Sequence, residues 1–256
     1  LRDEKTPPGI LVLPTGAGKS LIIANIVREL NEPTVVFQPS KEILVQNYHK
    51  YLSYGEHASI YSASAGVKEI SNVTFATIGS VYKKTDLFKE FKHVIIDECH
   101  LVNPAKSMYK TFLSAVGTHN IMGLTATPYR LGSNSRGMEL RFLTRTRPKV
   151  FHKVVYSVGI QKLLSEGFLC PLKYHQLKNF DRSKVDMNSA GTDFEEDSLK
   201  RYYGAINFEA GVVKVVNRLV ETGRRGILVF TRFVAEAKSL SEQVPGAAFV
   251  CGDTPK

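Results

Sequence analysis

The chain has 256 residues, enough for one large domain or two modest ones, and its 43% hydrophobic and 23% charged residues are ordinary for a globular protein. It contains neither an apolar run of the roughly 18 residues that span a membrane nor a charged and then apolar leader, so we expect a cytoplasmic protein without membrane contact. The formal net charge of +10 favours a nucleic-acid partner, although excess lysine also aids solubility.

Short apolar runs alternate with helical patterns through the first half of the chain. Near-continuous Val, Ile, Leu and Phe content is typical of parallel strands buried on both faces, and the alternation predicts an α/β fold with a doubly wound parallel sheet. In such sheets ligands bind beyond the carboxyl ends of the strands, where polar residues follow each run here. The expected strands cover residues 9–14, 34–40, 72–80, 93–98 and 120–128, and the expected helices cover residues 20–30 and 41–52.

The second half begins with a basic insertion, residues 132–153, which is either a nucleic-acid contact or a loop with spare positive charge. Its basic residues are Arg136, Arg141, Arg145, Arg147, Lys149 and Lys153. After it, strand and helix patterns alternate again, so a second βα unit opens near residue 172 and is incomplete. The expected strands are 153–158, 172–178, 224–232 and 247–253, and the expected helices are 160–171, 205–221 and 234–244.

The stretch LPTGAGKS, Leu13–Ser20, follows a strand and opens a helix, which is the context of a phosphate-binding loop. Glycines let backbone N–H groups turn toward phosphate oxygens, and the helix N-terminus adds partial positive charge. Lys19 can reach the β- and γ-phosphates, and the Ser20 hydroxyl can bind Mg²⁺. The predicted nucleotide-binding residues are Pro14, Thr15, Gly16, Ala17, Gly18, Lys19 and Ser20.

The stretch HVIIDECH, residues 93–100, ends a strand in two carboxylates, a thiol and an imidazole. Cys99 and His100 lack the partners of a zinc site, and Cys99 as a nucleophile needs a base that sequence cannot place. Because a phosphate loop lies in the same sheet, we interpret Asp97, at the end of a neighbouring strand, as the Mg²⁺ ligand and Glu98 as the residue that polarises water. Three cysteines without CxxC spacing argue against disulfides.

The stretch LTATP, residues 124–128, carries two hydroxyls, on Thr125 and Thr127. They can hydrogen-bond to His100 or to the acids and report the state of the γ-phosphate. By itself the stretch indicates only a turn at a strand end. Its position after DECH in the chain supports the functional interpretation.

Together these motifs resemble the superfamily 2 helicases and translocases, the DEAD/DEAH-like group. LPTGAGKS resembles motif I, DECH motif II, TATP motif III, VVFQPSKEILVQ motif Ia, ATIGS motif Ib and ILVFTR motif IV. More narrowly, GLTATPYRLGS, GFLCPLKYH and the CGDTP ending are similar to bacterial RadD-type DNA-repair helicases.

The resemblance implies two RecA-like lobes that use ATP and Mg²⁺: residues 1–160, a linker helix at 161–171, and an incomplete second lobe at 172–256. Lys19, Asp97, Glu98 and His100 would be catalytic, and His100, Thr125 and Thr127 would couple nucleotide state to movement. The expected partner is nucleic acid, with single-stranded or forked DNA favoured, and other repair proteins are further candidate partners. The protein is expected to act as a monomer. The implied nucleic-acid contacts are Pro39, Ser40, Gln46, Thr77, Ser80, Thr231 and Arg232.

Two features of the family pattern are absent from these residues. The adenine-reading glutamine motif does not precede the phosphate loop, and motifs V and VI, with the arginine finger, are expected beyond Lys256. An arginine finger contributes 10³–10⁵ in rate, so we expect ATP binding with poor hydrolysis. Arg130, after TATP, is interpreted as a surface or nucleic-acid-contacting arginine rather than as a finger. The alternatives are a restriction-enzyme motor, an RNA-directed helicase, and a nucleic-acid-binding module with a silent nucleotide site.

Overall fold

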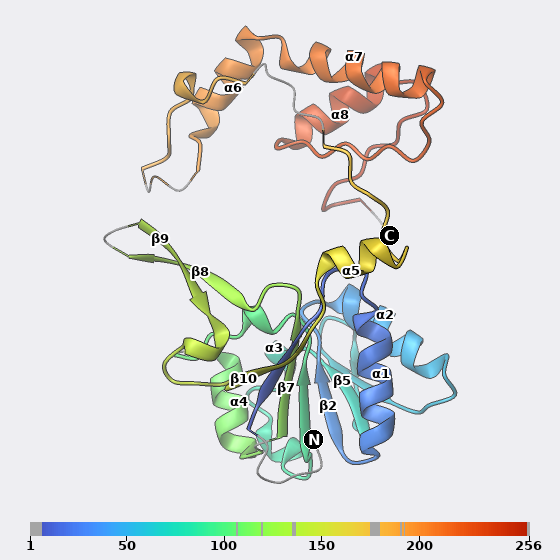
Figure 1. The fold of residues 1–256 in the computed structure, drawn as a ribbon, viewed down its shortest axis with the longest axis vertical. Coiled ribbons are helices and arrows are strands. Elements are labelled where there is room, and N and C mark those ends of the chain that lie inside the picture. The colour runs from blue at the N-terminus through green and yellow to red at the C-terminus, as the bar shows by residue number, and fades with distance from the viewer. Residues whose placement is uncertain are drawn as a thin grey trace. The chain divides into compact units, whose positions relative to one another are not determined.

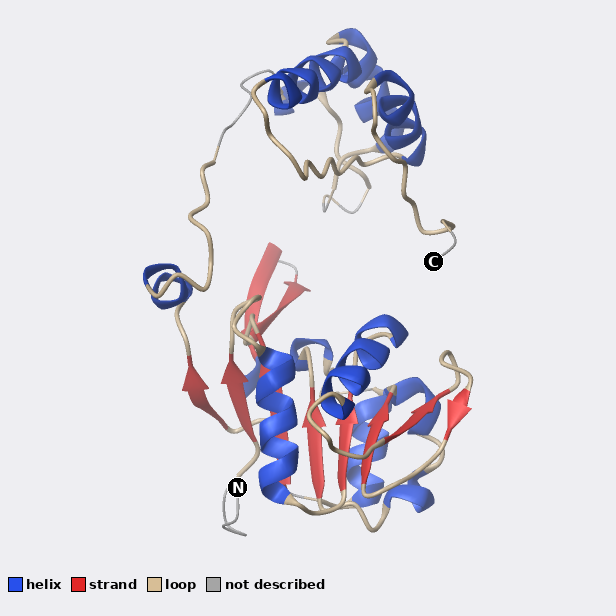
Figure 2. Cartoon of the chain, turned by 90° about the vertical axis from the view of Figure 1, so that its right-hand side faces the viewer, coloured by secondary structure: helices blue, strands red, loops and turns tan. Residues whose placement is uncertain are grey.

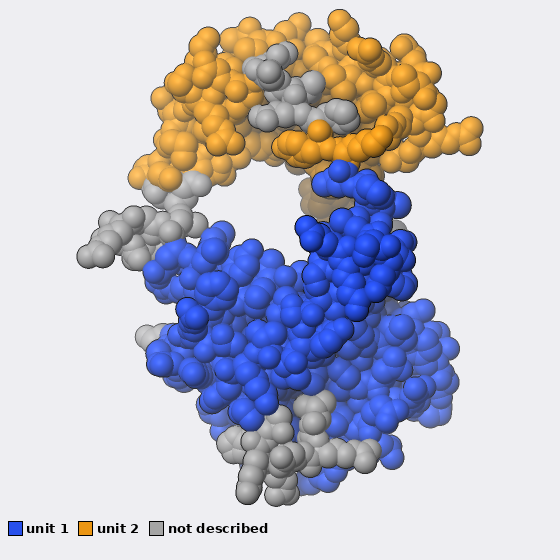
Figure 3. Space-filling view, viewed as in Figure 1, with its two compact units in different colours: residues 1–172 blue, residues 173–256 orange. Residues whose placement is uncertain are grey.

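The computed structural model describes residues 7–105, 107–118, 120–134, 137–174, 180–189, 191 and 193–254, without the side chains of 133, 134, 137 and 138. The chain divides into two compact units, residues 1–172 and residues 173–256 (Figure 3).

The first unit is an α/β structure in which helices cover a central sheet (Figures 1 and 2). The sheet has eight strands in the order β10-β1-β7-β6-β2-β5-β3-β4. All neighbouring strands are parallel except β3 and β4. The predicted doubly wound parallel sheet is therefore confirmed. The strands are β1 (Gly9–Val12), β2 (Thr34–Phe37), β3 (Ser59–Ser62), β4 (Val67–Lys68), β5 (Val73–Ala76), β6 (His93–Ile96), β7 (Asn120–Thr125) and β10 (Lys153–Ser157).

Burial on both faces explains the apolar runs. Every residue of β2, β5 and β6 is buried, and successive side chains enter two different cores. In β2, Val36 packs in the core beneath α1 (Lys19–Leu30) and α2 (Lys41–Leu52), whereas Phe37 meets Phe112 of α4 (Met108–Val116) on the other face. Two short elements, α3 (Ile78–Val81) and η1 (Thr85–Phe88), also lie on the α4 face.

The register brings the carboxyl ends of the central strands to one edge. Val12 of β1 pairs with Thr125 of β7, and Ile96 of β6 pairs with both Gly123 of β7 and Phe37 of β2. The residues that follow β1, β2, β6 and β7 consequently meet at this edge. One detail differs from the expectation: β6 is not the neighbour of β1, because β7 lies between them.

Several expected elements are shorter or divided. The strand predicted at 72–80 ends at Ala76, and the helix predicted at 160–171 is α5 (Ile160–Ser165), followed by Gly167 at φ 77°. The basic insertion contains an antiparallel hairpin of β8 (Tyr129–Asn134) and β9 (Gly137–Phe142), then η3 (Leu143–Arg145). The hairpin, β3, β4 and α4 were missing from the sequence prediction because their apolar patterns are short or interrupted by polar residues.

The second unit is helical where it is described. It contains η4 (Arg182–Lys184), α6 (Glu196–Ala205), α7 (Phe208–Glu221) and α8 (Val234–Gln243), with a small core of Val185, Leu199 and Tyr202. The helix expected at 205–221 starts later, because Asn207 adopts the left-handed conformation at φ 51°.

The strands predicted at 224–232 and 247–253 are wrong, since neither segment forms a strand. A strand needs a hydrogen-bonded partner, and the apolar side chains of Leu228, Phe230 and Val250 remain 82%, 91% and 73% exposed. Of the strand expected at 172–178, residues 172–174 are not in a strand and 175–178 lie outside the described residues. No helix in the described part of the chain is long and apolar enough to cross a membrane.

Candidate nucleotide site

The phosphate loop connects β1 to α1 at the carboxyl edge of the sheet. Its entry is fixed by the backbone N–H of Leu13, which donates to the Thr125 carbonyl at 2.8 Å, and a turn joins the Ala17 N–H to the Pro14 carbonyl at 3.1 Å. Gly16 and Gly18 have φ angles of 85° and 77°, which strongly favour glycine. The helix that follows has no side-chain cap, so its first N–H groups are available to an anion.

A second reason for glycine at position 16 lies far along the chain. A Cβ built on Gly16 would come within 2.7 Å of Cδ2 of Leu169, so the segment after α5 packs directly over the loop. No sequence pattern predicts this contact, because nothing local links the segment to the loop.

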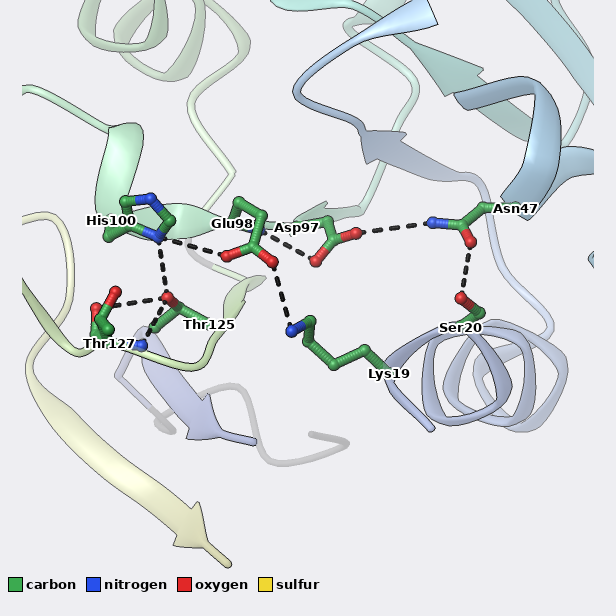
Figure 4. Close-up of polar contacts among 8 residues, drawn as sticks. All are labelled: Lys19, Ser20, Asn47, Asp97, Glu98, His100, Thr125 and Thr127. Carbon is green, nitrogen blue, oxygen red and sulfur yellow. Dashed lines mark hydrogen bonds and ion pairs between the residues drawn. The ribbon is translucent and has the colours of Figure 1, made fainter. Parts of the chain in front are cut away.

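Lys19 and Glu98 form an ion pair, with Nζ 3.2 Å from Oε1 (Figure 4). Their side chains are 15% and 25% exposed, so a ligand can reach them. The two predicted catalytic residues therefore meet, although their strands are separated by β7. Since a γ-phosphate and Glu98 would compete for the same ammonium group, nucleotide binding must loosen this pair.

Ser20 and Asp97 are joined by a residue that the sequence analysis did not assign to the nucleotide site. The Ser20 hydroxyl donates to Oδ1 of Asn47 at 2.6 Å, and Nδ2 of Asn47 donates to Oδ2 of Asp97 at 3.5 Å (Figure 4). Asn47 lies on α2 and is 5% exposed. Its only sequence signal is a polar residue on the buried face of an amphipathic helix, one position after Gln46.

Asp97 is 4% exposed, and burial raises the pKa of its carboxyl group, assisted by the negative charge of Glu98 and opposed by the backbone N–H of Glu98, by Lys19 and by Asn47. A buried acid with a raised pKa is suited to a cation, whose charge replaces the missing solvation. The donors are also appropriate: a hydroxyl, a carboxylate and an amide oxygen are hard ligands of the type that Mg²⁺ takes, with phosphate oxygens and water completing its shell.

The backbone turns sharply after β6. Glu98 has a φ of 47°, in the left-handed region, and its N–H donates to Oδ1 of Asp97 at 2.9 Å. This turn starts the short helix η2 (Cys99–Leu101) and separates the two acids. Cys99 is completely buried, and burial raises the pKa of its thiol above the usual range, so Cys99 does not act as a nucleophile.

His100 connects the acid to the end of β7. Its Nδ1 lies 2.9 Å from Oγ1 of Thr125 and 3.2 Å from Oε2 of Glu98. Thr125 is buried, accepts from the N–H of Thr127 at 3.1 Å and donates to the Thr127 carbonyl at 3.2 Å. A carboxylate only accepts, so this network assigns the proton to Nδ1. The structure thus brings together the three residues of the predicted coupling path.

The predicted nucleic-acid residues of the first unit follow two adjacent strands, β2 and β5. Ser40 caps α2 by accepting from the Ile43 N–H at 3.4 Å, and Thr77 and Ser80 share a hydroxyl contact of 2.9 Å. Ser80 also accepts from the Ala63 N–H at 2.8 Å. Pro39 precedes this cap, and Gln46 is exposed on α2.

Thr231 and Arg232 belong to the second unit. The Arg232 guanidinium makes two hydrogen bonds to the carboxylate of Asp193, at 3.1 and 2.9 Å, and the Thr231 hydroxyl donates to the Phe233 carbonyl at 3.0 Å. The Arg232 side chain is 33% exposed, and a phosphate would have to displace Asp193.

Comparison with known proteins finds chains to which this one is similar. The DNA 3'-5' translocase XPB2 of Sulfurisphaera tokodaii is 30% identical over 190 residues, which cover 71% of this chain and 40% of XPB2. The QP509L protein of African swine fever virus (strain Badajoz 1971 Vero-adapted), provisionally named an ATP-dependent RNA helicase, is 32% identical over 266 residues, covering 94% of this chain and 51% of QP509L. The crystal structure of bacteriophage T4 UvsW has a TM-score of 0.45 at 17% identity, covering 96% of this chain and 49% of that one.

The chain thus spans about half or less of the length of these curated relatives. A protein-family model described as the type III restriction enzyme, res subunit, matches residues 1–130, from the phosphate loop through the TATP stretch. Because that match covers half of the 256 residues, the chain belongs to this family of superfamily 2 helicases.

Proposed function

We propose that the chain is the ATP-binding part of an ATP-dependent helicase or translocase that moves on or unwinds DNA, acting in DNA repair. The observation that carries the proposal is the meeting of the phosphate loop with both acids at one sheet edge, through Lys19–Glu98 and Ser20–Asn47–Asp97. This geometry suits phosphoryl transfer, in which catalysis is mainly positioning and charge stabilisation.

Each residue has a distinct role in this proposal. The loop from Pro14 to Ser20 presents its N–H groups to the phosphates, and Lys19 exchanges Glu98 for phosphate oxygens. Ser20 and Asp97 would hold Mg²⁺, which neutralises phosphate charge when bound. Glu98, released from Lys19, orients and polarises the attacking water.

The coupling step would follow from the same exchange. Glu98 holds the proton-bearing Nδ1 of His100, which also contacts Thr125, so any movement of Glu98 alters the hydrogen bonds at the end of β7. The carbonyl and N–H of Thr127 complete that path toward the β8–β9 hairpin. Pro39, Ser40, Gln46, Thr77 and Ser80 would contact DNA at the ends of β2 and β5, and Thr231 and Arg232 would extend the track.

Residues 172–256 are proposed as an incomplete second RecA-like lobe, joined to the lobe at 1–160 by the 161–171 linker. The ILVFTR stretch between α7 and α8 supports this proposal. The absence of a strand at residues 224–232 argues against it. The closer similarity to RadD-type repair helicases rests on the short stretches GLTATPYRLGS, GFLCPLKYH and CGDTP.

A second candidate is the motor of a restriction enzyme, which the description of the matching family favours. An RNA-directed helicase is favoured by the provisional name of QP509L. These functions use the same ATP site, so the polymer that stimulates hydrolysis separates RNA from DNA, and nuclease activity identifies the restriction enzyme.

The test is binding of a fluorescent ATP analogue with Mg²⁺ by this chain, followed by single-turnover ATP hydrolysis by the full-length protein with single-stranded DNA, duplex DNA, RNA or no polymer. Lys19→Ala should weaken binding about tenfold or more, since a hydrogen bond to a charged group contributes about 1.5–3 kcal/mol. The Glu98→Gln variant should bind the ATP analogue but should not hydrolyse ATP.

The control is Lys50→Ala, an exposed lysine in the last turn of α2, which should leave both quantities unchanged. Equal binding by Lys19→Ala and the unaltered chain would refute the ATP site. Hydrolysis indifferent to all polymers would refute a nucleic-acid motor.

A further inference from the structure

A cavity lined by four arginines lies outside the nucleotide site. Its volume is about 600 Å³, and it is bounded by the β8–β9 hairpin, residues 103–105 and the segment after η3. The arginines are Arg130, Arg141, Arg145 and Arg147. Three of them belong to the basic insertion, whose role the sequence left open between a contact and a loop.

The hairpin places two of these arginines against each other. Arg130 of β8 pairs directly with Arg141 of β9, so both side chains leave the same face of the ribbon. Like charges directly opposite are destabilising, and a two-stranded ribbon has little stability to spare. Gly132 leaves the space that the Arg141 side chain occupies, since a Cβ there would lie 2.5 Å from Nε of Arg141.

Most of this positive charge is not neutralised. Arg141 forms a salt bridge with Glu139, which removes roughly one charge. The salt bridges recorded for the described part of the chain do not include Arg130, Arg145 or Arg147. Nη1 of Arg147 donates to the Thr146 carbonyl at 3.4 Å, which leaves its charge unpaired. An anion entering the cavity would therefore meet guanidinium groups that no acid neutralises.

The same cavity has an apolar wall that a simple phosphate site would not need. Leu131, Leu140 and Phe142 also line it and are 66%, 53% and 43% exposed. Because side chains alternate along a strand, these three leave the face of the ribbon opposite to Arg130 and Arg141. The Arg145 guanidinium lies over the Phe142 ring, 5.7 Å from its centroid. Exposed apolar side chains among arginines suit a ligand that carries negative charge and a flat ring together.

The cavity is directly connected to the proposed ATPase. The hairpin starts at Tyr129, two residues after Thr127, and Thr125 at the end of β7 is the residue that His100 contacts. The cavity therefore lies beyond the carboxyl edge of the sheet, where the phosphate loop and the residues after β2 and β5 also lie.

We propose that this cavity binds single-stranded nucleic acid, with Arg145 and Arg147 on backbone phosphates and Phe142 against a base. A single strand offers phosphates and unstacked bases together, whereas a duplex keeps its bases stacked inside and offers mainly phosphates. The net charge of +10 favours a polymer over a free nucleotide. The choice of nucleic acid as the ligand rests on the proposed function. The proposal concerns nucleic-acid binding in the absence of ATP, which is measured independently of ATP binding.

The experiment measures fluorescence anisotropy of a labelled single-stranded DNA 20-mer with the complete chain, without nucleotide, over a range of salt concentrations. Arg145→Ala with Arg147→Ala should raise Kd about tenfold. The salt slope should fall by about 1.4, since each lost phosphate contact on a single strand removes about 0.7. Phe142→Leu should raise Kd and leave the slope unchanged, because a stacking contact releases no counterions.

The matched control is Arg28→Ala with Lys50→Ala, which removes the same charge from exposed positions in the last turns of α1 and α2. It should change Kd by less than the cavity variant. Equal loss in both double variants would overturn the proposal in favour of general attraction to positive charge. Full displacement of the labelled single strand by polyglutamate would also overturn it. So would a cavity variant that binds duplex DNA more weakly while its affinity for single-stranded DNA is unchanged.

These results are independent of the ATP site. The cavity variants should bind the fluorescent ATP analogue with unchanged Kd, and Lys19→Ala should bind DNA normally. If Lys19→Ala loses no ATP binding while the cavity variant loses DNA binding, the proposed ATPase fails and the nucleic-acid site stands. If the cavity variant retains its DNA affinity, the cavity proposal fails whatever happens at Lys19.

Discussion

Asn47 determines how the two predicted Mg²⁺ ligands are held. Its amide oxygen accepts from Ser20 while its NH₂ group donates to Asp97, so a single neutral side chain satisfies a hydroxyl and a buried carboxylate at once. No charged or apolar side chain of similar size can do both. A water or a metal ion inserted between Ser20 and Asp97 must displace or rearrange this amide.

Asn47→Leu tests this role while preserving the size of the side chain. Leaving a buried polar group without its partner costs about 1–3 kcal/mol, so thermal unfolding should shift to lower temperature. The Mg²⁺ dependence of ATP-analogue binding should weaken as well, because the two ligands lose their alignment. Asn25→Leu, on the exposed side of α1, is the control and should retain both. Unchanged Mg²⁺ dependence in Asn47→Leu would contradict the positioning role.

Asn47→Asp tests the charge. A second carboxylate beside Asp97 raises the pKa of the buried pair further above ordinary values, because like charges cannot both be ionised at low cost. A raised carboxyl pKa means that the folded state binds more protons than the unfolded state, so stability falls as pH rises through that pKa. The variant should approach the stability of the unaltered chain in acid and lose it by pH 7, as measured by thermal melts across pH.

At the scale of elements, the turn after β6 depends on close packing against β7. A Cβ on Gly123 would lie 2.6 Å from Sγ of Cys99 and 2.8 Å from Cε1 of Phe151, both buried. Cys99 therefore has a packing role, and its thiol limits how closely the DECH turn approaches the strand that carries Thr125. The spacing between Glu98, His100 and Thr125 is set by this contact.

Gly123→Ala should overpack this contact and destabilise the fold by about 1–3 kcal/mol in denaturant unfolding. Adding Cys99→Ala removes the nearest atom, so the double variant should be more stable than the sum of the single effects predicts. Relief will be partial because Cβ of residue 99 and Cε1 of Phe151, both 2.8 Å from the added Cβ, remain. Strict additivity in this double-mutant cycle would contradict the proposed contact.

The same elements explain what could be predicted from sequence. The stretches LPTGAGKS, DECH and TATP lie at one sheet edge, as predicted, because each is contiguous and follows an apolar strand, and parallel strands present their carboxyl ends together. Asn47 and Leu169 escaped prediction because their contacts join residues far apart in the chain. The strands expected at 224–232 and 247–253 failed because an apolar run specifies a strand only when partners exist to pair with it.

On the scale of the whole molecule, the two units differ in their cores. The two large hydrophobic clusters lie entirely within the first unit, whereas the second has a cluster of three buried residues, Val185, Leu199 and Tyr202. The nucleotide site from Pro14 to Thr127 and the arginine cavity also belong to the first unit. Since a domain needs its own core to fold alone, stability and ligand binding should both reside there.

A chain ending at Leu172 should consequently unfold cooperatively and bind the ATP analogue with the same Kd as the complete chain. A chain ending at Ile160, near the boundary expected from sequence, should be less stable, because it loses the buried Leu163 of α5 and the Leu169 side chain over Gly16. Burial of a leucine contributes about 1.5–3 kcal/mol, so calorimetry should resolve the two truncations. Equal melting of both would show that the α5 segment lies outside the folding unit, and loss of binding by the 172-residue chain would place part of the ATP site in the second unit.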